Sequence, residues 1–238
     1  MRNKVLFLLL FLFLIPFVAN FFNPKIGEFV RIKLNINSEA EINSYYKRLV
    51  TVHQRMDGNI DNGSIIFLGD SLTQSLNVTE ISQNAVNYGI GSDTTYGLLN
   101  RLSNYKSINK ADAIVLSIGI NDFIYNRSPD LIIDNYKKIF DYIPEDKNIY
   151  LNSLFPVSLT YTKNNSKVSI EKIKKLNNEL ARVCSLKPKC KYLNNYDYFS
   201  DKSGYLNKKY DVGDGIHINT KGYDLWINIL KSNLNKIN

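Results

Sequence analysis

The chain has 238 residues, of which 44% are hydrophobic and 22% are charged, an ordinary composition for a globular protein. These values exclude an intrinsically disordered chain and a polytopic membrane protein. The net charge is +8, but the Lys and Arg residues are scattered and form no long basic run, so we expect a solvated cationic surface and no nucleic-acid partner. Beyond an apolar N-terminus, about two hundred residues remain, enough for one compact domain.

The N-terminus has the features of an export signal. Arg2 and Lys4 precede an apolar run from Val5 to Phe22, which corresponds to a charged n-region followed by an h-region. No small-residue pair typical of a cleavage site ends this run, and its length of about 18 residues is at the lower limit for crossing a bilayer. We therefore expect residues 1–24 to be an uncleaved signal anchor, with a single folded domain outside the cytoplasm in residues 25–238. The alternative is a cleaved signal peptide and a secreted or periplasmic protein.

Short β-rich runs alternate with helical segments along the rest of the chain. Strands are predicted at residues 64–68, 85–88, 113–118, 148–152 and 191–194. Apolar residues at helical spacing predict helices at 93–104, 129–142, 168–183 and 220–234, with a leading helix at 39–55 and a long loop at 155–167. This alternation predicts an α/β fold, a three-layer doubly wound (flavodoxin-like) sheet of about five parallel strands with helices on both faces.

Two cysteines lie where a predicted helix ends and a predicted strand begins. Cys184 and Cys190 flank Pro188, so their side chains can meet across this connection. Outside the cytosol such a pair is expected to form a disulfide. The alternative is a pair of unbonded thiols, since the spacing matches no metal site.

Polar or glycine-containing turns follow the first three predicted strands, at the sheet edge where α/β folds bind ligands. Ser71 lies in the turn Gly-Asp-Ser-Leu after the first strand, where its hydroxyl is exposed near a helix N-terminus, a suitable place for a nucleophile. Gly91 follows the second strand and allows a main-chain N–H to approach a substrate oxygen. Asn121 follows the third and offers a side-chain amide as an oxyanion donor. Each turn alone is more often structural, and their order along the chain favours a function.

A serine hydroxyl becomes a good nucleophile only when a base takes its proton. The sequence contains two histidines, and His53 falls on the leading helix, whereas His217 falls in a loop predicted to reach the serine. Asp214 precedes His217 by three residues, close enough to share one turn with it. Two other carboxylates, Asp70 and Asp122, are expected to brace their turns through local hydrogen bonds.

These four blocks resemble the SGNH, or GDSL-type, hydrolase superfamily. The matching motifs are GDSL at 69–72, Gly91 within NYGIGSDTT, GIND at 119–122 and DGIH at 214–217. The pattern is most similar to the branch that contains the platelet-activating-factor acetylhydrolase α subunits and bacterial carbohydrate and lipid esterases. The resemblance covers residues 64–226 and leaves out the leader and the leading helix.

The resemblance implies a serine esterase with Ser71 as the nucleophile, His217 as general base and then general acid, and Asp214 as the group that orients the imidazole. The implied oxyanion hole consists of the Ser71 and Gly91 N–H groups and the Asn121 side chain, without a metal or other cofactor. The expected substrate is a short-chain carboxylic ester, an acetyl ester above all, of an envelope glycan or lipid, and the expected membrane contact is made by the N-terminal segment. The alternatives are an O-acetyltransferase using the same site, and an inactive SGNH-like domain that binds a glycan or a protein.

Overall fold

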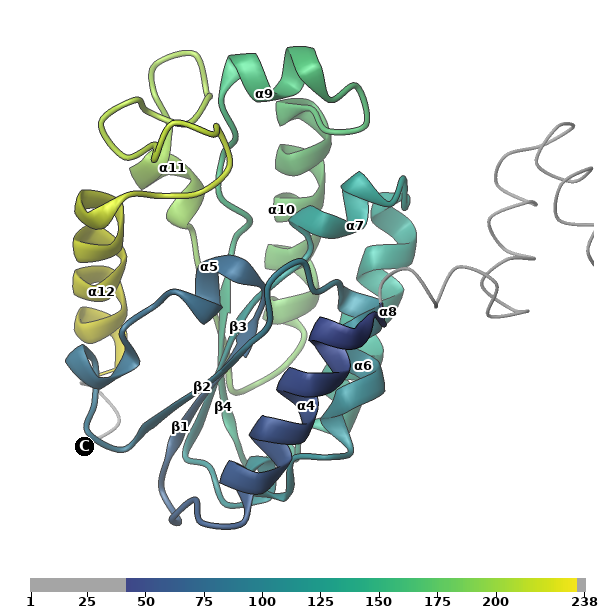
Figure 1. The fold of residues 1–238 in the computed structure, drawn as a ribbon, viewed down its shortest axis with the longest axis vertical. Coiled ribbons are helices and arrows are strands. Elements are labelled where there is room, and N and C mark those ends of the chain that lie inside the picture. The colour runs from purple at the N-terminus through teal and green to yellow at the C-terminus, as the bar shows by residue number, and fades with distance from the viewer. Residues whose placement is uncertain (1–41, 235–238) are drawn as a thin grey trace, which may run out of the picture. The chain divides into compact units, whose positions relative to one another are not determined.

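The computed structural model describes residues 42–234 (Figure 1), which apart from the first three belong to one compact unit that begins at Tyr45. The predicted signal anchor at residues 1–24 and the start of the predicted leading helix lie outside the described residues. Across residues 42–234, no helix combines the length and the apolar character needed to span a membrane.

Five parallel strands form the sheet in the order β2-β1-β3-β4-β5. This order is the flavodoxin-like one, and it confirms the predicted fold class. Each strand boundary lies within one residue of its predicted position, because buried parallel strands appear in the sequence as short runs of apolar residues. The strands are β1 (Ile65–Gly69), β2 (Ala85–Gly89), β3 (Ala113–Ser117), β4 (Asn148–Asn152) and β5 (Cys190–Leu193).

Helices cover both faces of this sheet. The longer ones are α4 (Ser44–Asp57), α6 (Thr95–Leu102), α8 (Pro129–Tyr142), α10 (Ile170–Ser185) and α12 (Thr220–Leu234), and the short ones are α5 (Ser71–Gln74), α7 (Ile120–Ile124), α9 (Leu159–Asn164) and α11 (Asn195–Phe199), with 3-10 turns at Val78–Glu80 and Lys106–Asn109. Buried apolar residues of α6, α8 and α10 contribute to one cluster, those of α5 and α12 contribute to a second, and α11 contributes Tyr196 to the first and Phe199 to the second. Figure 1 shows α12 on the opposite side of the sheet from α6 and α8.

The two clusters are built from alternate residues of the same strands. In β1, Ile66 and Leu68 belong to the cluster that includes α6, α8 and α10, whereas Phe67 belongs to the cluster that includes α12. All three side chains are at most 1% exposed. Successive side chains of a strand point to opposite faces, so a strand covered on both faces must be apolar throughout.

The segment at residues 155–167 differs from the prediction of a long loop, because it contains the helix α9. The Ser158 hydroxyl accepts a hydrogen bond from the Tyr161 N–H (3.1 Å) and caps the first turn of this helix. None of the residues of α9 is buried, so the sequence carries no apolar stripe by which the helix could be predicted.

The leading helix α4 packs on the core through buried polar side chains. The Asp57 carboxylate accepts a hydrogen bond from the Tyr88 hydroxyl (3.0 Å), and His53 Nδ1 lies 3.2 Å from the Tyr105 hydroxyl. Burial, together with the positive charge of Arg101, lowers the pKa of His53 to about 4. This histidine therefore lies within the core and is neutral at physiological pH.

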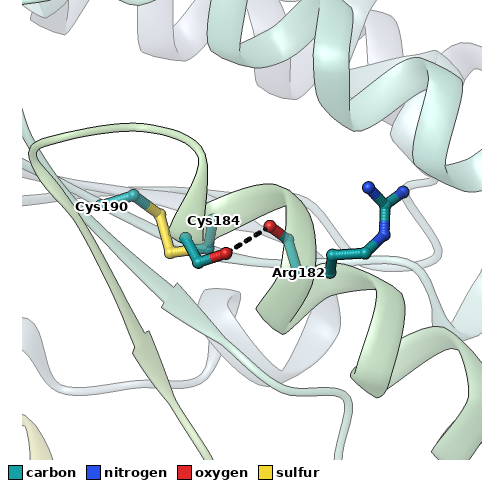
Figure 2. The surroundings of a disulfide bond; sticks show 4 residues. Arg182, Cys184 and Cys190 are labelled. Carbon is teal, nitrogen blue, oxygen red and sulfur yellow. Dashed lines mark hydrogen bonds between the residues drawn. A yellow bond between two sulfur atoms is a disulfide. The ribbon is translucent and has the colours of Figure 1, made fainter.

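A disulfide joins the end of α10 to the start of β5 (Figure 2). Cys184 and Cys190 are bonded, with their Cα atoms 5.3 Å apart. Beside them, the Ser185 hydroxyl donates a hydrogen bond to the Arg182 carbonyl (2.7 Å) in the last turn of α10. The disulfide thus links two cysteines that are only six positions apart in the sequence.

Candidate active site

Ser71, His217 and Asp214 lie in one hydrogen-bonded chain. Ser71 is the first residue of α5, directly after β1, and its Oγ lies 2.9 Å from His217 Nε2. On the other side of the imidazole, Nδ1 lies 2.6 Å from Asp214 Oδ2. Residues that are 146 positions apart in the sequence are thus within direct reach. His217 and Asp214 both come from the turn that precedes α12.

Ser71 is presented by a capped helix start. The Asp70 side chain accepts a hydrogen bond from the Leu72 N–H (3.1 Å), which caps α5. Among residues 42–234, no group accepts a hydrogen bond from the Ser71 N–H itself. Burial raises the pKa of Asp70 to about 7, against the effect of the Leu72 N–H and with some help from the charges of Asp93 and Asp122. As expected from the sequence, Asp70 braces its turn.

The turn from Asp214 to His217 is held by Asp214 itself. Its Oδ1 accepts hydrogen bonds from the N–H groups of Ile216 (3.0 Å) and His217 (2.9 Å). Burial alone would raise the pKa of Asp214, but these two hydrogen bonds and the contact with the imidazole lower it below its ordinary value. An ionised Asp214 accepts the Nδ1–H of His217, so the lone pair of Nε2 faces Ser71.

Gly215 lets this turn pass close to a neighbouring segment. Its φ is 82°, and its carbonyl accepts a hydrogen bond from the Ser158 N–H (2.8 Å). A Cβ at this position would lie 2.2 Å from Ser158 Oγ, so both the backbone conformation and the space require glycine. The Asp211 carboxylate holds the other side of the turn, since it accepts the N–H groups of Gly213 (2.7 Å) and Gly215 (3.0 Å).

The predicted oxyanion donors differ in their availability. Asn121, on α7, is 8% exposed, and its Nδ2 donates one hydrogen to the Asp93 carbonyl (2.9 Å), which leaves its second amide hydrogen for another acceptor. The Gly91 N–H is engaged, because it donates to Gln74 Oε1 at 2.5 Å. The next residue, Ser92, has φ of 63°, and within the described part of the chain nothing accepts from its N–H.

The engaged Gly91 N–H differs from the expectation that this group is free to bind an oxyanion. The physical reason is the nearby Gln74 side chain, which α5 brings to the turn after β2. Sequence analysis overlooked both Gln74 and Ser92. A signal for Ser92 was present, since the motif places a serine between Gly91 and Asp93 where a tight turn is expected.

A fully buried arginine fixes the strand ends that carry these turns. Arg101, on α6, pairs with Asp93 (Nε to Oδ2, 2.8 Å), and both side chains are at most 1% exposed. Its guanidinium also donates to the carbonyls of Tyr88 (2.7 Å) and Gly69 (3.1 Å). Because Gly69 and Tyr88 lie at the ends of β1 and β2, Arg101 braces the two turns that contain Ser71 and the Gly91–Ser92 peptide.

Asp122 makes more distant contacts than the local ones expected from the sequence. Its carboxylate accepts hydrogen bonds from the N–H (2.9 Å) and hydroxyl (2.7 Å) of Thr95, at the start of α6. It also accepts one from Arg127 Nη1 (3.1 Å). Asp122 therefore ties α7 to α6 and brings the Asn121 side chain against the turn that ends at Asp93.

A small cavity is lined by the sequence neighbours of Ser71 and His217. It has a volume of about 10 Å³, roughly the space that one water molecule needs. Leu72, which follows Ser71, and Ile216, which precedes His217, both line it. The other lining residues come from the ends of β1, β3 and β4 and the segments after them, and they are Asp70, Ser117, Ile118, Ile120, Leu154, Phe155, Pro156 and Val157. Over residues 42–234, no group of three or more His, Cys, Asp or Glu side chains is arranged to hold a metal ion.

Comparison with known families agrees with this geometry. The model of the GDSL-like Lipase/Acylhydrolase family matches residues 67–225, which include all four sequence blocks. The chain belongs to this family. This membership agrees with the resemblance to the SGNH hydrolase superfamily that the motifs indicated.

Solved structures share the fold of this GDSL-type chain at low sequence identity. A protein from Streptococcus pneumonia provisionally named platelet activating factor has a TM-score of 0.74 and 24% identity, over 85% of this chain and 98% of that one. A GDSL-like lipase from Bacteroides thetaiotaomicron has a TM-score of 0.68 and 21% identity, over 80% of this chain and 97% of that one. An acetyl xylan esterase, AlAXEase, has a TM-score of 0.59 and 16% identity, over 72% of this chain and 99% of that one.

A curated relative is a larger enzyme of a different name. The GDSL-type chain is 31% identical over 167 residues to an N-acylneuraminate cytidylyltransferase of Streptococcus agalactiae serotype III. The match includes 68% of this chain and only 36% of the relative. The chain therefore spans about a third of the length of the curated relatives it matches.

Proposed function

We propose that the protein hydrolyses short-chain carboxylic esters, acetyl esters above all, through an acyl-enzyme formed on Ser71. The observation that carries the proposal is the hydrogen-bonded chain from Ser71 Oγ to His217 Nε2 (2.9 Å) and from His217 Nδ1 to Asp214 (2.6 Å). A serine, a histidine and a carboxylate in this order are the groups of a catalytic triad.

In the first half of the reaction, Ser71 Oγ attacks the ester carbonyl carbon while His217 Nε2 takes the hydroxyl proton. Asp214 stabilises the resulting imidazolium. His217 then gives this proton to the alkoxy oxygen of the tetrahedral intermediate, the bond to that oxygen breaks, and the alcohol leaves. In the second half a water loses a proton to His217 and attacks the acyl-enzyme. The carboxylic acid leaves, and the proton returns to Ser71.

The negative charge that develops on the carbonyl oxygen requires hydrogen-bond donors. We propose the Ser71 N–H, the second hydrogen of the Asn121 amide, and the Ser92 N–H in the place first assigned to Gly91. The support for Ser92 is that its N–H has no acceptor within residues 42–234, whereas the Gly91 N–H already donates to Gln74.

The small cavity supports a short acyl chain. Its volume of about 10 Å³ is close to the space that one water molecule needs, and Leu72, Ile120 and Ile216 are among the side chains that surround it. We propose that the methyl of an acetyl ester lies there. We expect kcat/KM to fall steeply from acetyl to longer esters.

The names of similar proteins support a sugar as the alcohol part of the ester. One structural neighbour is an acetyl xylan esterase, and the curated relative that contains a segment similar to this chain acts, by its name, on N-acylneuraminate. Sugars carry several hydroxyls that can be esterified. We therefore propose an O-acetylated glycan, acidic sugars included, as the substrate, and a location outside the cytoplasm on the basis of Arg2, Lys4 and the apolar run that follows.

A matched pair of serine variants tests the proposal. Full-length wild-type protein, Ser71→Ala and the control Ser103→Ala, at an exposed serine after α6, should be assayed on p-nitrophenyl acetate, butyrate and octanoate and then on acetylated glycans. Wild type and Ser103→Ala should hydrolyse the acetate ester and react with a fluorophosphonate probe. Ser71→Ala should lose about 10³-fold or more in kcat with an unchanged circular-dichroism spectrum. An alanine variant that keeps most of the wild-type rate would show that another group is the nucleophile.

A further inference from the structure

The Gln74 side chain bridges the turn after β2 and the leading helix. Gln74 is the last residue of α5, three positions after Ser71. Its Oε1 accepts the Gly91 N–H at 2.5 Å, and its Nε2 donates to the Tyr45 hydroxyl at 2.7 Å. Both side chains cover Gly91, because a Cβ at that position would lie 2.9 Å from Gln74 Oε1 and 3.7 Å from the Tyr45 hydroxyl. Three segments thus meet at a single side-chain amide.

The turn that Gln74 holds is closed by one main-chain hydrogen bond, from the Asp93 N–H to the Ile90 carbonyl (3.1 Å), in which the N–H groups of Gly91 and Ser92 take no part. Before it, the Ile90 N–H donates to the Gly69 carbonyl (3.0 Å), and after it, the Asp93 carbonyl accepts from Asn121 (2.9 Å). Between these anchors lies Ser92, whose φ of 63° is unfavourable for a residue with a side chain. A non-glycine residue keeps such a conformation only when its surroundings hold it there.

Gln74 supplies such a hold through the neighbouring peptide group. The plane of the peptide that contains the Gly91 N–H is fixed when that N–H points at Gln74 Oε1. The orientation of the Gln74 amide is fixed in turn, since only its NH₂ group can donate to the Tyr45 hydroxyl when its oxygen accepts from Gly91. Fixing one peptide plane limits the positions open to the next N–H, that of Ser92.

An alternative role for the same contact is that of a latch, in which the Gln74 side chain blocks the Gly91 N–H and moves away from it when substrate binds. Opening it would break the hydrogen bond from Gly91 and require Gln74 to leave Tyr45. The Ser92 N–H can accept an oxyanion with no such displacement, because no group within residues 42–234 occupies it. The contacts therefore favour a holding role.

We propose that Gln74 is a positioning residue of the esterase, which holds the turn after β2 so that the Ser92 N–H points at the oxyanion, and that Tyr45 sets the orientation of the Gln74 amide. This inference rests on the proposed function. Tyr45 lies on α4, outside the matched residues 67–225, so the leading helix becomes part of the catalytic apparatus.

Kinetics of four full-length variants test this role. Gln74→Leu keeps much of the side-chain volume but loses both hydrogen bonds, and its kcat should fall about tenfold, less than the 10²–10³ typical of losing a whole oxyanion donor. KM should stay within about twofold, because the donor matters most in the transition state. Tyr45→Phe should show a smaller fall in kcat. The control Tyr142→Phe, at a tyrosine that is 44% exposed at the end of α8, should match wild type.

Four further measurements separate positioning from simple structural support. The double variant Gln74→Leu/Tyr45→Phe should be no slower than Gln74→Leu, because Tyr45 acts through Gln74. The rate of fluorophosphonate inactivation should fall in parallel with kcat, and the pH profile and melting temperature should stay unchanged, because the phosphoryl oxygen needs the same donors while His217 and Asp214 are untouched.

Three outcomes would overturn the inference. An unchanged kcat in Gln74→Leu would show that the contact has no part in catalysis, and a raised kcat would show a latch. Additive losses in the double variant would show that Tyr45 does not act through Gln74. A wild-type protein that neither hydrolyses esters nor reacts with the probe would instead refute the proposed function, and this inference with it.

Discussion

Replacing Arg101 with methionine should destabilise the protein strongly, although it removes none of the proposed catalytic groups. Methionine fills a similar volume but has no charge and no donor. The guanidinium is fully buried and donates to four acceptors, namely Asp93 Oδ2, the Tyr105 hydroxyl and the carbonyls of Tyr88 and Gly69. The substitution would leave all four without this partner.

The expected magnitude follows from these contacts. Removing one partner of a buried ion pair costs about 3–5 kcal/mol, because the other charge stays buried and unpaired. Unsatisfied carbonyls add to this cost, and relaxation of the site reduces it, so we expect the free energy of unfolding to fall by about 4 kcal/mol. This is a large part of the 5–15 kcal/mol that is typical of a domain. A second substitution, Asp93→Asn, should recover about 1–2 kcal/mol in the Arg101→Met background, since it removes the unpaired charge.

Urea denaturation followed by circular dichroism measures these differences. The control is Arg182→Met, because Arg182 pairs with Glu179 at the surface (2.9 Å) and its side chain is 56% exposed. This control should change the free energy of unfolding by less than about 1 kcal/mol. The reasoning fails if Arg101→Met lies within about 1 kcal/mol of wild type, or if adding Asp93→Asn makes the protein still less stable.

Three other predictions concern pH, the triad and the N-terminus. The pKa of Asp70 is about 7 in the folded protein against an ordinary 3.8, so the folded state binds this proton more tightly, and stability should decline as pH rises from about 4 to about 7. The Asp70→Asn variant should flatten this decline when its melting temperature is compared with that of wild type from pH 5 to 8. Parallel curves for the two proteins would contradict the raised pKa of Asp70. For Asp214→Asn, kcat should fall by about 10³–10⁴ because an amide cannot hold the reactive tautomer of His217, whereas stopped-assay rates close to wild type would exclude a triad. Deleting residues 1–24 should yield a soluble, active esterase, while the full-length protein stays with membranes after an alkaline wash; a mature N-terminus between Asn20 and Lys25, found by intact mass, would show cleavage instead.

The sequence predicted the elements whose patterns are local. Continuous apolar runs such as Ile65–Leu68 identify strands covered on both faces, and the stripe of Ile173, Leu176 and Leu180 identifies α10. The helix α9 was not predicted, because none of its residues is buried and its start is marked only by a single capping serine, Ser158. Periodicity reports burial, so an exposed helix leaves little trace in the sequence.

The same distinction holds for the candidate site, where local motifs could be predicted from the sequence and a long-range contact could not. Ser71, Asn121 and the Asp214–His217 pair could be predicted because each lies in a short motif directly after a strand or before a helix. The contact of Gln74 with Gly91 joins a side chain to a main-chain N–H across 17 residues, and it depends on how α5 lies against the next strand. No local pattern in a sequence encodes such a contact.

The distance along the chain between Ser71 and His217 has a consequence for when the enzyme becomes active. During synthesis, the first strand and its serine emerge 146 residues before the histidine that would activate it. A nascent chain that has already begun to fold would still carry an inert serine, because α12 and the turn before it have not yet joined the sheet. The proposed hydrolytic activity would therefore arise only with completion of the fold.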